Sequence, residues 1–308
     1  MGAYLIRRIL QVIPVFIGTT LLVYWLMFAG STDPLQALAG ERPVTPAERL
    51  VLEERFNLND PFILQYVKYL GRLLTGDLGQ QLNGRDISNV LSTAWPITIR
   101  LALVAFAFTI VFGITAGILA GMRRKGVFDT TVLVSTLVVI SIPVFVLGST
   151  LQFLFGVQFR IFPVAVGGEA TWFELLLPGM VLGALALATT ARLTRTSIAE
   201  NLRMDYVRTA RSKGLPTARV VGVHVLRNSL IPVVTFLGAG LGDLMAGAIV
   251  TESIFNIPGV GFQIRQGIRA EDGPTVVTIV SILVLVYLIA NLVVDVLYAV
   301  LDPRIRYD

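Results

Sequence analysis

The chain is predicted to be an all-α integral membrane protein with six transmembrane helices. Three observations predict this class: 55% of its residues are hydrophobic, only 15% are charged, and six long apolar runs recur along its 308 residues. Soluble domains carry about 25% charged residues, so the composition is typical of a membrane protein. Each run is 17 to 25 residues long, and roughly 20 residues cross a bilayer as a helix.

The apolar runs are almost free of charge. Asp243 lies inside the fifth run and Asp295 directly follows the sixth, whereas the other four runs contain no charged residue. Only helices and closed barrels satisfy every backbone group in lipid. The runs lack the alternation of barrel strands, so we expect helices at 9–29, 101–120, 131–155, 175–191, 229–250 and 276–294.

The first run follows Arg7 and Arg8 and precedes small residues, as a signal peptide does. At 21 residues it is longer than a usual signal h-region, so we expect an uncleaved span.

Basic residues predict the orientation of the spans. If the N-terminus is inside, the cytoplasmic segments hold 15 Lys and Arg but only five Asp and Glu, whereas the outer segments hold ten basic and thirteen acidic residues. Both termini are therefore expected in the cytoplasm. The net charge of +5 reflects this topology, and the basic stretch lacks the interleaved aromatic residues of a nucleic-acid platform, so no nucleic-acid partner is expected.

Enzyme motifs are missing from the sequence. It has no cysteine, so disulfides and thiolate chemistry are excluded. With one histidine, His224, no Ser-His-Asp triad and no His-based metal site can be built. No G-x-x-x-x-G-K-[ST] loop is present, so the chain does not bind ATP by that route. We therefore expect no catalytic residues, no metal and no cofactor.

Residues 30–100 form the longest segment between spans and are expected to be a small outer helical subdomain. A helix is predicted over 46–58 with Thr45 as its cap, and apolar residues from Phe62 to Leu74 recur at helical spacing. Two interpretations stay open: a cap that covers the span ends, or a contact surface for an external partner. The expected division of the chain is therefore 1–29, 30–100 and 101–308.

The cytoplasmic loop 192–228 is the most informative segment. Ile198, Leu202, Tyr206 and Ala210 recur every four residues as one apolar stripe. Gly214 suits a left-handed helix stop. Pro216 suits the first turn of a new helix. This helix–corner–helix surface is either a docking site for another protein or an amphipathic helix on anionic lipid.

Asp243 is the one acidic residue inside a predicted span, and such residues often mark ion or substrate pathways. It either lines a pathway or makes a structural hydrogen bond. The neighbouring glycines are expected to permit close helix packing; they are Gly238, Gly240, Gly242 and Gly247.

Several motifs resemble the permease signature of bacterial ABC importers, specifically the B-type side of the dipeptide/oligopeptide permease family. The central motif runs from Tyr206 to Leu215, and the resemblance covers essentially the whole chain. Further matching motifs are Leu58-Asn59-Asp60-Pro61, Gly76-Asp77-Leu78-Gly79, the stretch from Glu252 to Gly261, and the tail from Val294 to Tyr307. The chain departs from the general importer signature in having Asp205-Tyr206-Val207 where that signature begins with Glu-Ala-Ala.

The resemblance implies a type I ABC importer permease fold in the bacterial inner membrane, with loop 192–228 as a cytoplasmic coupling helix. It implies a second, similar permease subunit, two ATP-binding subunits and an external substrate-binding protein as partners. The residues expected to contact an ATP-binding subunit are Tyr206, Ala210, Arg211, Lys213, Gly214, Leu215 and Pro216. Of these, Tyr206, Ala210 and Leu215 are expected to fill a cleft on that subunit.

Di- or oligopeptides are the expected cargo, translocated by alternating access that ATP hydrolysis on the partner subunits drives. Nickel complexes, glutathione and haem stay open as alternative cargo. The rival class is a stand-alone proton-coupled secondary transporter, which would need pathway carboxylates and usually internal repeats.

Overall fold

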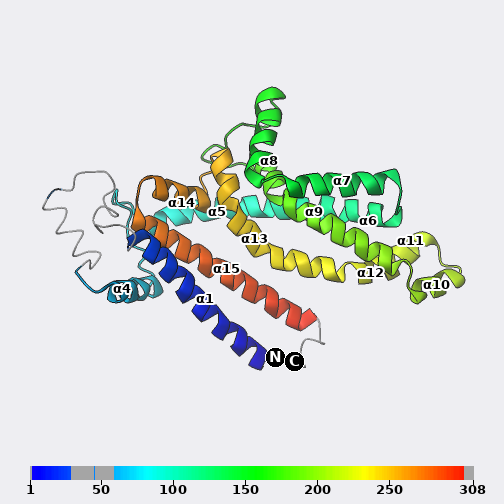
Figure 1. Ribbon diagram of the computed structural model, residues 1–308, viewed down its shortest axis with the longest axis horizontal. Helices are drawn as coiled ribbons and strands as arrows, with labels where there is room; N and C mark the ends of the chain where they lie inside the picture. The colour runs from blue at the N-terminus through cyan, green and yellow to red at the C-terminus, as the bar shows by residue number, and fades with distance from the viewer. Residues whose placement is uncertain (1, 29–44, 46–58, 302–308) are drawn as a thin grey trace. The chain divides into compact units, whose positions relative to one another are not determined.

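The computed structural model describes residues 2–28, 45 and 59–301. These residues form helices joined by loops (Figure 1), and the one β-type contact among them is an isolated antiparallel bridge between Gln80 and Asp86. The expected helix at 46–58 lies outside the described residues. The helices up to residue 158 are α1 (Gly2–Phe28), α4 (Phe62–Leu74), α5 (Ile87–Phe108), η1 (Thr109–Ile114), α6 (Thr115–Met122), α7 (Val127–Ser141), α8 (Val144–Leu151) and η2 (Gln152–Gln158).

The second half of the described chain is equally helical. Its helices are α9 (Leu176–Asn201), α10 (Asp205–Ser212), α11 (Thr217–Arg219), η3 (Val220–Val225), α12 (Leu226–Ser229), α13 (Ile231–Phe255), α14 (Val260–Arg269) and α15 (Gly273–Leu301). The segments η1, η2 and η3 are π-helical. The all-α prediction is confirmed.

Two compact units divide the chain, and the boundary between them falls inside α5. The first unit contains Met1–Thr98 and Pro258–Asp308, and the second contains Ile99–Ile257. This division follows the packing of the residues against one another. The division into 1–29, 30–100 and 101–308 concerns sides of the membrane and stays a prediction.

Four helical stretches are long and apolar enough to cross a membrane: Arg7–Phe28, Ile87–Met122, Leu176–Asn201 and Gly273–Val294. Two bent helix pairs also qualify and bring the number to six if each pair counts as one span. These six helical segments correspond to the six apolar runs. The second of them begins well before residue 101, because Ile87, Val90, Leu91, Ala94 and Ile97 already form a buried helical stripe.

The third predicted span is not one straight helix. Its two halves, Val127–Ser141 and Val144–Gln158, meet at an angle of 108°, and α8 projects away from α7 in Figure 1. Ile142 and Pro143 between them are extended rather than helical. Proline disfavours the helical conformation of the residue before it and cannot donate to the preceding turn, which explains the break.

In the first unit, α1 and α15 lie side by side (Figure 1) and α4 packs across them. Tyr24 and Phe28 of α1, Tyr66 of α4 and Val277 of α15 form a buried cluster. The Tyr66 hydroxyl donates to the carbonyl of Ile17 at 3.0 Å. The helix predicted from the apolar spacing between Phe62 and Leu74 is confirmed, and Phe62, Tyr66 and Leu70 on one of its faces pack in or around this cluster.

In the second unit, a glycine seam joins η1 and α6 to α9. A Cβ added to Gly117 would lie 2.5 Å from Cβ of Thr194, and one added to Gly113 would lie 3.1 Å from Cβ of Thr190. Gly121 is equally close to α9, 2.8 Å from the carbonyl oxygen of Arg195. Small residues every four positions let two membrane helices approach closely. Gly179 and Gly183 of α9 come equally close to α5, so the seam is one of the places where α9 packs tightly at a glycine.

Candidate functional site

The helix–corner–helix predicted after the fourth span is present, and its geometry comes from Gly214. Helix α10 ends at Ser212, and Gly214 has a φ of +75°. The Gly214 amide donates to the Arg211 carbonyl at 2.9 Å, and the Leu215 amide donates to the Ala210 carbonyl at 3.3 Å. These two bonds are the Schellman pattern of helix termination, which favours glycine at the left-handed position.

Pro216 starts the second arm of the corner. The amides of Arg219 and Val220 both donate to its carbonyl, at 2.9 and 3.1 Å. Proline is compatible with a helix start because its fixed φ is already helical and its missing N–H is not needed there. We call the segment 205–225, from α10 through α11 and η3, the coupling corner.

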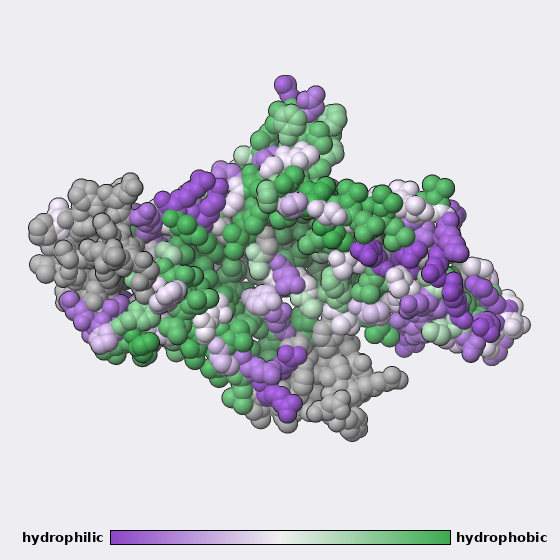
Figure 2. All heavy atoms as spheres, viewed as in Figure 1, coloured by the Kyte–Doolittle hydropathy of each residue, from purple (hydrophilic) through white to green (hydrophobic). Residues whose placement is uncertain are grey.

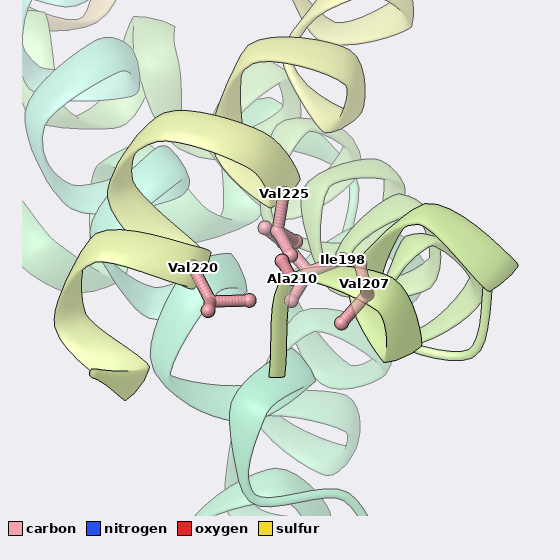
Figure 3. Packing of buried hydrophobic residues seen from close by; sticks show 5 residues of the cluster. All are labelled: Ile198, Val207, Ala210, Val220 and Val225. Atoms are coloured by element: carbon pink, nitrogen blue, oxygen red, sulfur yellow. The ribbon is translucent and has the colours of Figure 1, made fainter. Parts of the chain in front are cut away.

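An apolar cluster holds the coupling corner together from inside. Ile198 of α9, Val207 and Ala210 of α10, and Val220 and Val225 of η3 point toward one another (Figure 3), and all five are buried. The stripe predicted from a four-residue repeat is thus shared by two helices, because α9 ends at Asn201 before α10 begins.

The expectation that Tyr206, Ala210 and Leu215 fill a cleft on a partner stays a prediction, and within this chain all three side chains take part in the cluster. Ala210 is only 6% exposed, and Tyr206 and Leu215 pack against the same cluster from its edge. Three short helices each carry one apolar face, and burying these faces against one another removes them from water within the chain itself. These contacts bury Ala210 and leave Tyr206 and Leu215 partly exposed at the edge of the cluster.

Hydrogen bonds attach the corner to the end of α9. The Tyr206 hydroxyl donates to Asn201 Oδ1 at 2.6 Å, and Asn201 Nδ2 donates to the carbonyl of Ser197 at 2.9 Å. The same carbonyl accepts a bond from the Ser229 hydroxyl at 3.2 Å, just before α13. The corner is thus bonded to the end of α9, and the end of α9 is bonded in turn to α12, which leads into α13.

The exposed face of the corner is basic. Arg208, Arg211, Lys213 and Pro216 are exposed, as is Gly214 itself. Figure 2 shows hydrophilic residues gathered over the region that Figure 1 labels α10 and α11. The Arg208–Asp205 ion pair on this face, at 3.3 Å, is highly exposed and contributes little to stability.

The sequence analysis missed two exposed apolar side chains, one on the coupling corner and one directly before it. Met204, just before α10, is 49% exposed, and Val223 in η3 is 55% exposed. The exposure of Met204 could have been predicted from the sequence, because Met204 lies outside the four-residue stripe and its neighbours are polar. Val223 lies among three other valines from 220 to 225, and no pattern separates it from the buried ones.

A buried ion pair lies at the same end of the second unit. Arg195 of α9 donates to both carboxylate oxygens of Asp129 at the start of α7, at 2.7 and 2.8 Å. Asp129 also accepts the Lys125 amide at 2.8 Å. The Asp129 side chain is 3% exposed and that of Arg195 17%. The pair ties α7 and its preceding turn to α9, two residues before Ser197.

Asp243 is not part of the coupling corner. It lies in α13, twelve residues beyond Ile231, or about 18 Å along the helix. Its side chain is exposed in the isolated chain. At Gly240 nearby, an added Cβ would meet no atom within 4 Å, so the expected close packing at that glycine is not present within this chain. Asp243 and Gly240 therefore lie on a face that other molecules can reach.

Metal-binding chemistry finds no support in the described part of the chain. No group of three or more His, Asp or Glu side chains lies close enough there to hold a metal ion. His224, in η3, is half-buried.

Comparison with known proteins identifies the family. The description "binding-protein-dependent transport system inner membrane component" matches residues 113–307, and its N-terminal counterpart matches residues 1–87. The chain is 38% identical to the di/tripeptide transport system permease protein DppB of Pseudomonas aeruginosa, with 100% of both chains covered. It is 35% identical to the dipeptide transport system permease protein DppB of Escherichia coli K12, covering 99% of this chain and 98% of that one.

The name of a third relative specifies oligopeptides rather than di- or tripeptides. The chain is 33% identical to the oligopeptide transport system permease protein AppB of Bacillus subtilis, with 100% of both chains covered. These matches extend over all the helices described above, including the coupling corner. The chain belongs to the family of binding-protein-dependent transport system inner membrane components, the membrane permease subunits of ABC importers.

Proposed function

We propose that this chain translocates di- or oligopeptides delivered by an external binding protein, as one of two permease subunits driven by two ATP-binding subunits. The observation that carries this proposal is the coupling corner. Its own core holds it in shape and leaves a basic, accessible face at the end of two long helices. The peptide cargo is suggested by the relatives, whose names specify dipeptides, di- and tripeptides, or oligopeptides.

The ATP-binding subunit would contact the exposed face of the corner. Met204 and Val223 supply apolar surface, while Arg211 and Lys213 supply positive charge beside Gly214. Exposed charge pairs contribute about 0–1 kcal/mol each, so the apolar contacts and the shape of the corner would carry most of the affinity.

The packing of the corner explains how a movement of the ATP-binding subunits would reach the spans. Because α10 is packed on Ile198 and bonded to Asn201, a displacement of α10 moves the end of α9. Because Arg195 binds Asp129, the start of α7 moves with it. The corner therefore acts on at least two membrane helices together, which suits alternating access.

The experiment that tests docking replaces Gly214 with valine. The new side chain has open space around it, so the only cost is the left-handed backbone, which a β-branched residue adopts poorly. Gly222→Val is the matched control, because Gly222 lies in the same corner without a positive φ and also has open space.

Both variants should insert and fold, but only Gly214→Val should lose association with the ATP-binding subunit and peptide uptake. Co-purification and uptake by membrane vesicles measure the two effects. Normal uptake with Gly214→Val would contradict docking at the corner and favour its alternative role as a helix on the lipid surface.

The orientation, with both termini in the cytoplasm, is tested by labelling. The chain has no cysteine, so Thr217→Cys in the corner and Ser88→Cys near the start of α5 each introduce a unique thiol at an exposed position. A membrane-impermeant reagent added to whole cells should label residue 88 and leave residue 217 unlabelled. The opposite pattern would reverse the topology.

Asp243 distinguishes ATP-driven import from the rival, proton-coupled transport. If Asp243 lines the pathway, Asp243→Asn should slow uptake while the complex still assembles. If Asp243 makes a structural hydrogen bond, Asp243→Asn should leave uptake nearly unchanged, whereas Asp243→Leu should lower the folded yield. Proton coupling would require the Asn variant to stay active while losing its dependence on the proton gradient, an outcome we do not expect.

The identity of the cargo needs a separate experiment. The ligand that co-purifies with the partner binding protein decides between peptides and nickel complexes, glutathione or haem.

A further inference from the structure

A short turn in the second unit joins two helical stretches that can cross the membrane. The stretch Ile87–Met122 ends directly before it, and the stretch Val127–Ser141 begins directly after it. At about 3.5 Å per residue, a chain that leaves Met122 and returns at Val127 reaches at most roughly 9 Å beyond the helix ends. Residues 123–126 therefore lie in or beside the layer of lipid headgroups.

This turn has a defined conformation that presents three basic side chains. Lys125 has a φ of +66°, which is uncommon for a residue other than glycine. Its amide donates to Asp129 Oδ2 at 2.8 Å, and the Gly126 amide donates to the Arg123 carbonyl at 3.0 Å. These two bonds close the turn, and the side chains of Arg123, Arg124 and Lys125 are exposed.

The chain itself does not neutralise these three charges. Asp129 is the nearest acidic residue in sequence, but it is buried and Arg195 binds both of its oxygens. No carboxylate in the described part of the chain forms an ion pair with the three basic side chains. The turn therefore presents three adjacent positive charges to an acceptor outside the chain.

Apolar side chains flank the basic ones and are also exposed. Met122 and Phe128 are each 43% exposed, and Val127 is 86% exposed. Exposed apolar groups beside basic ones are typical of segments that lie in the membrane interface. Basic residues at the end of a span attract anionic lipids. An anionic phospholipid meets both needs, because its phosphate pairs with the charges and its acyl chains cover the apolar groups.

We propose that the turn 123–126 binds the headgroups of anionic phospholipids, and that this contact steadies the coupling corner. Two contacts connect the turn to the corner. Asp129 joins the turn to Arg195 of α9, and Ile118 of α6 packs against the apolar cluster inside the corner. The lipid contact is independent of the cargo, whereas its effect on coupling rests on the proposed function.

The first test measures lipid binding at the turn directly. The chain has no cysteine, so Val127→Cys introduces a unique thiol for a nitroxide label in an otherwise cysteine-free complex. In phosphatidylcholine nanodiscs with increasing phosphatidylglycerol, the label should become less mobile. At 1 M salt, where the Debye length is about 3 Å, this effect should largely disappear. A label whose mobility does not respond to phosphatidylglycerol would overturn the proposal.

Variants then assign the binding to the turn. Each basic residue near an anionic surface changes the affinity about fivefold, so Arg124→Gln should raise the midpoint of the phosphatidylglycerol titration by about that factor. Arg124→Lys keeps the charge and should keep the midpoint. Arg227→Gln is the matched control, because Arg227 is an exposed basic residue on the same expected side but outside the turn. An equal shift with Arg227→Gln would show that only the total charge matters, against a site at the turn.

The ATP-binding subunit is the other candidate occupant of the turn. In pure phosphatidylcholine, adding the ATP-binding subunits should leave the label at residue 127 unchanged. If they immobilise it there, the turn contacts protein and the lipid proposal fails.

The effect on coupling is measured as ATP hydrolysis stimulated by the external binding protein. Phosphatidylglycerol should raise this stimulation in the unaltered complex and in Arg124→Lys, but less in Arg124→Gln. Equal stimulation in all three complexes, with lipid binding intact, would refute the effect on the corner. Absence of stimulation in every lipid would instead count against the proposed function, and the label titration would still decide whether the turn binds lipid.

Discussion

Two buried aspartates hold the starts of two membrane helices, and they do so with different partners. Asp129 at the start of α7 accepts the Lys125 amide and binds the Arg195 guanidinium with both oxygens. Asp272 before α15 accepts the Thr275 amide at 3.1 Å and the Leu82 amide at 3.0 Å. Each carboxylate therefore joins a local turn to a segment far away in sequence. One far partner is a full charge and the other is a backbone amide.

This difference decides what the loss of each carboxylate leaves behind. Removing Asp129 leaves a largely buried guanidinium without its counter-charge, whereas removing Asp272 leaves two neutral N–H groups. A buried unpaired charge costs more than a neutral group that has lost its acceptor. The first region should consequently depend on its aspartate more strongly than the second.

The largest expected effect is that of Asp129→Ala, which should lower the free energy of unfolding by about 3 kcal/mol. Thermal unfolding of the purified complex measures it. Because the cost lies in the unpaired Arg195, the double variant Asp129→Ala/Arg195→Ala should lose less than the sum of the two single variants. Asp205→Ala is the control, since its exposed pair with Arg208 should contribute almost nothing. Additive losses would mean that the ion pair is not the stabilising contact.

A smaller effect is expected at Asp272. Asp272→Ala removes a helix cap and the bond to Leu82, and should cost about 1–2 kcal/mol. Hydrogen exchange should become faster at the amides of Thr275 and Leu82. Asp272→Asn keeps one acceptor oxygen, so only one of the two amides should exchange faster. Unchanged protection of both amides in the alanine variant would show that other contacts hold this loop.

The smallest effect concerns Glu174, an exposed counterpart of these aspartates. Its carboxylate accepts the Thr171 amide and hydroxyl, both at 2.8 Å, and these bonds hold the pKa of Glu174 below its usual range. The stabilisation is therefore present above the unfolded pKa near 4.5 and is lost as the pH falls through the folded value. Glu174→Gln should make the unfolding temperature slightly less dependent on pH below about 4.5. An identical pH profile in both proteins would contradict this.

The sequence predicted the fold and the corner but not the contacts that hold them. Six spans, Gly214 and Pro216 follow from local rules of length and backbone conformation. Asp129 and Arg195 are 66 residues apart, and no local pattern connects them. The amide of Leu82 is 190 residues from Asp272 and has no sequence signature at all.

The packing partners of the apolar residues in the corner also could not be predicted from local sequence patterns. A four-residue repeat shows that Tyr206 and Ala210 share a face, but not whether that face meets the chain's own valines or another protein. The bend at Pro143 could have been read from the sequence, because proline within an apolar run often breaks a helix.

The glycine seam sets an order of events during synthesis. Gly113, Gly117 and Gly121 leave the ribosome about 55 residues ahead of α9, the helix that covers them. At about 5–20 residues per second, this interval lasts roughly 3–11 seconds. During that time the grooved face of η1 and α6 has only lipid against it. Gly117→Val would fill the groove before α9 arrives, so its expected defect is a failure of newly made chains to mature, visible in a pulse-chase experiment as rapid degradation.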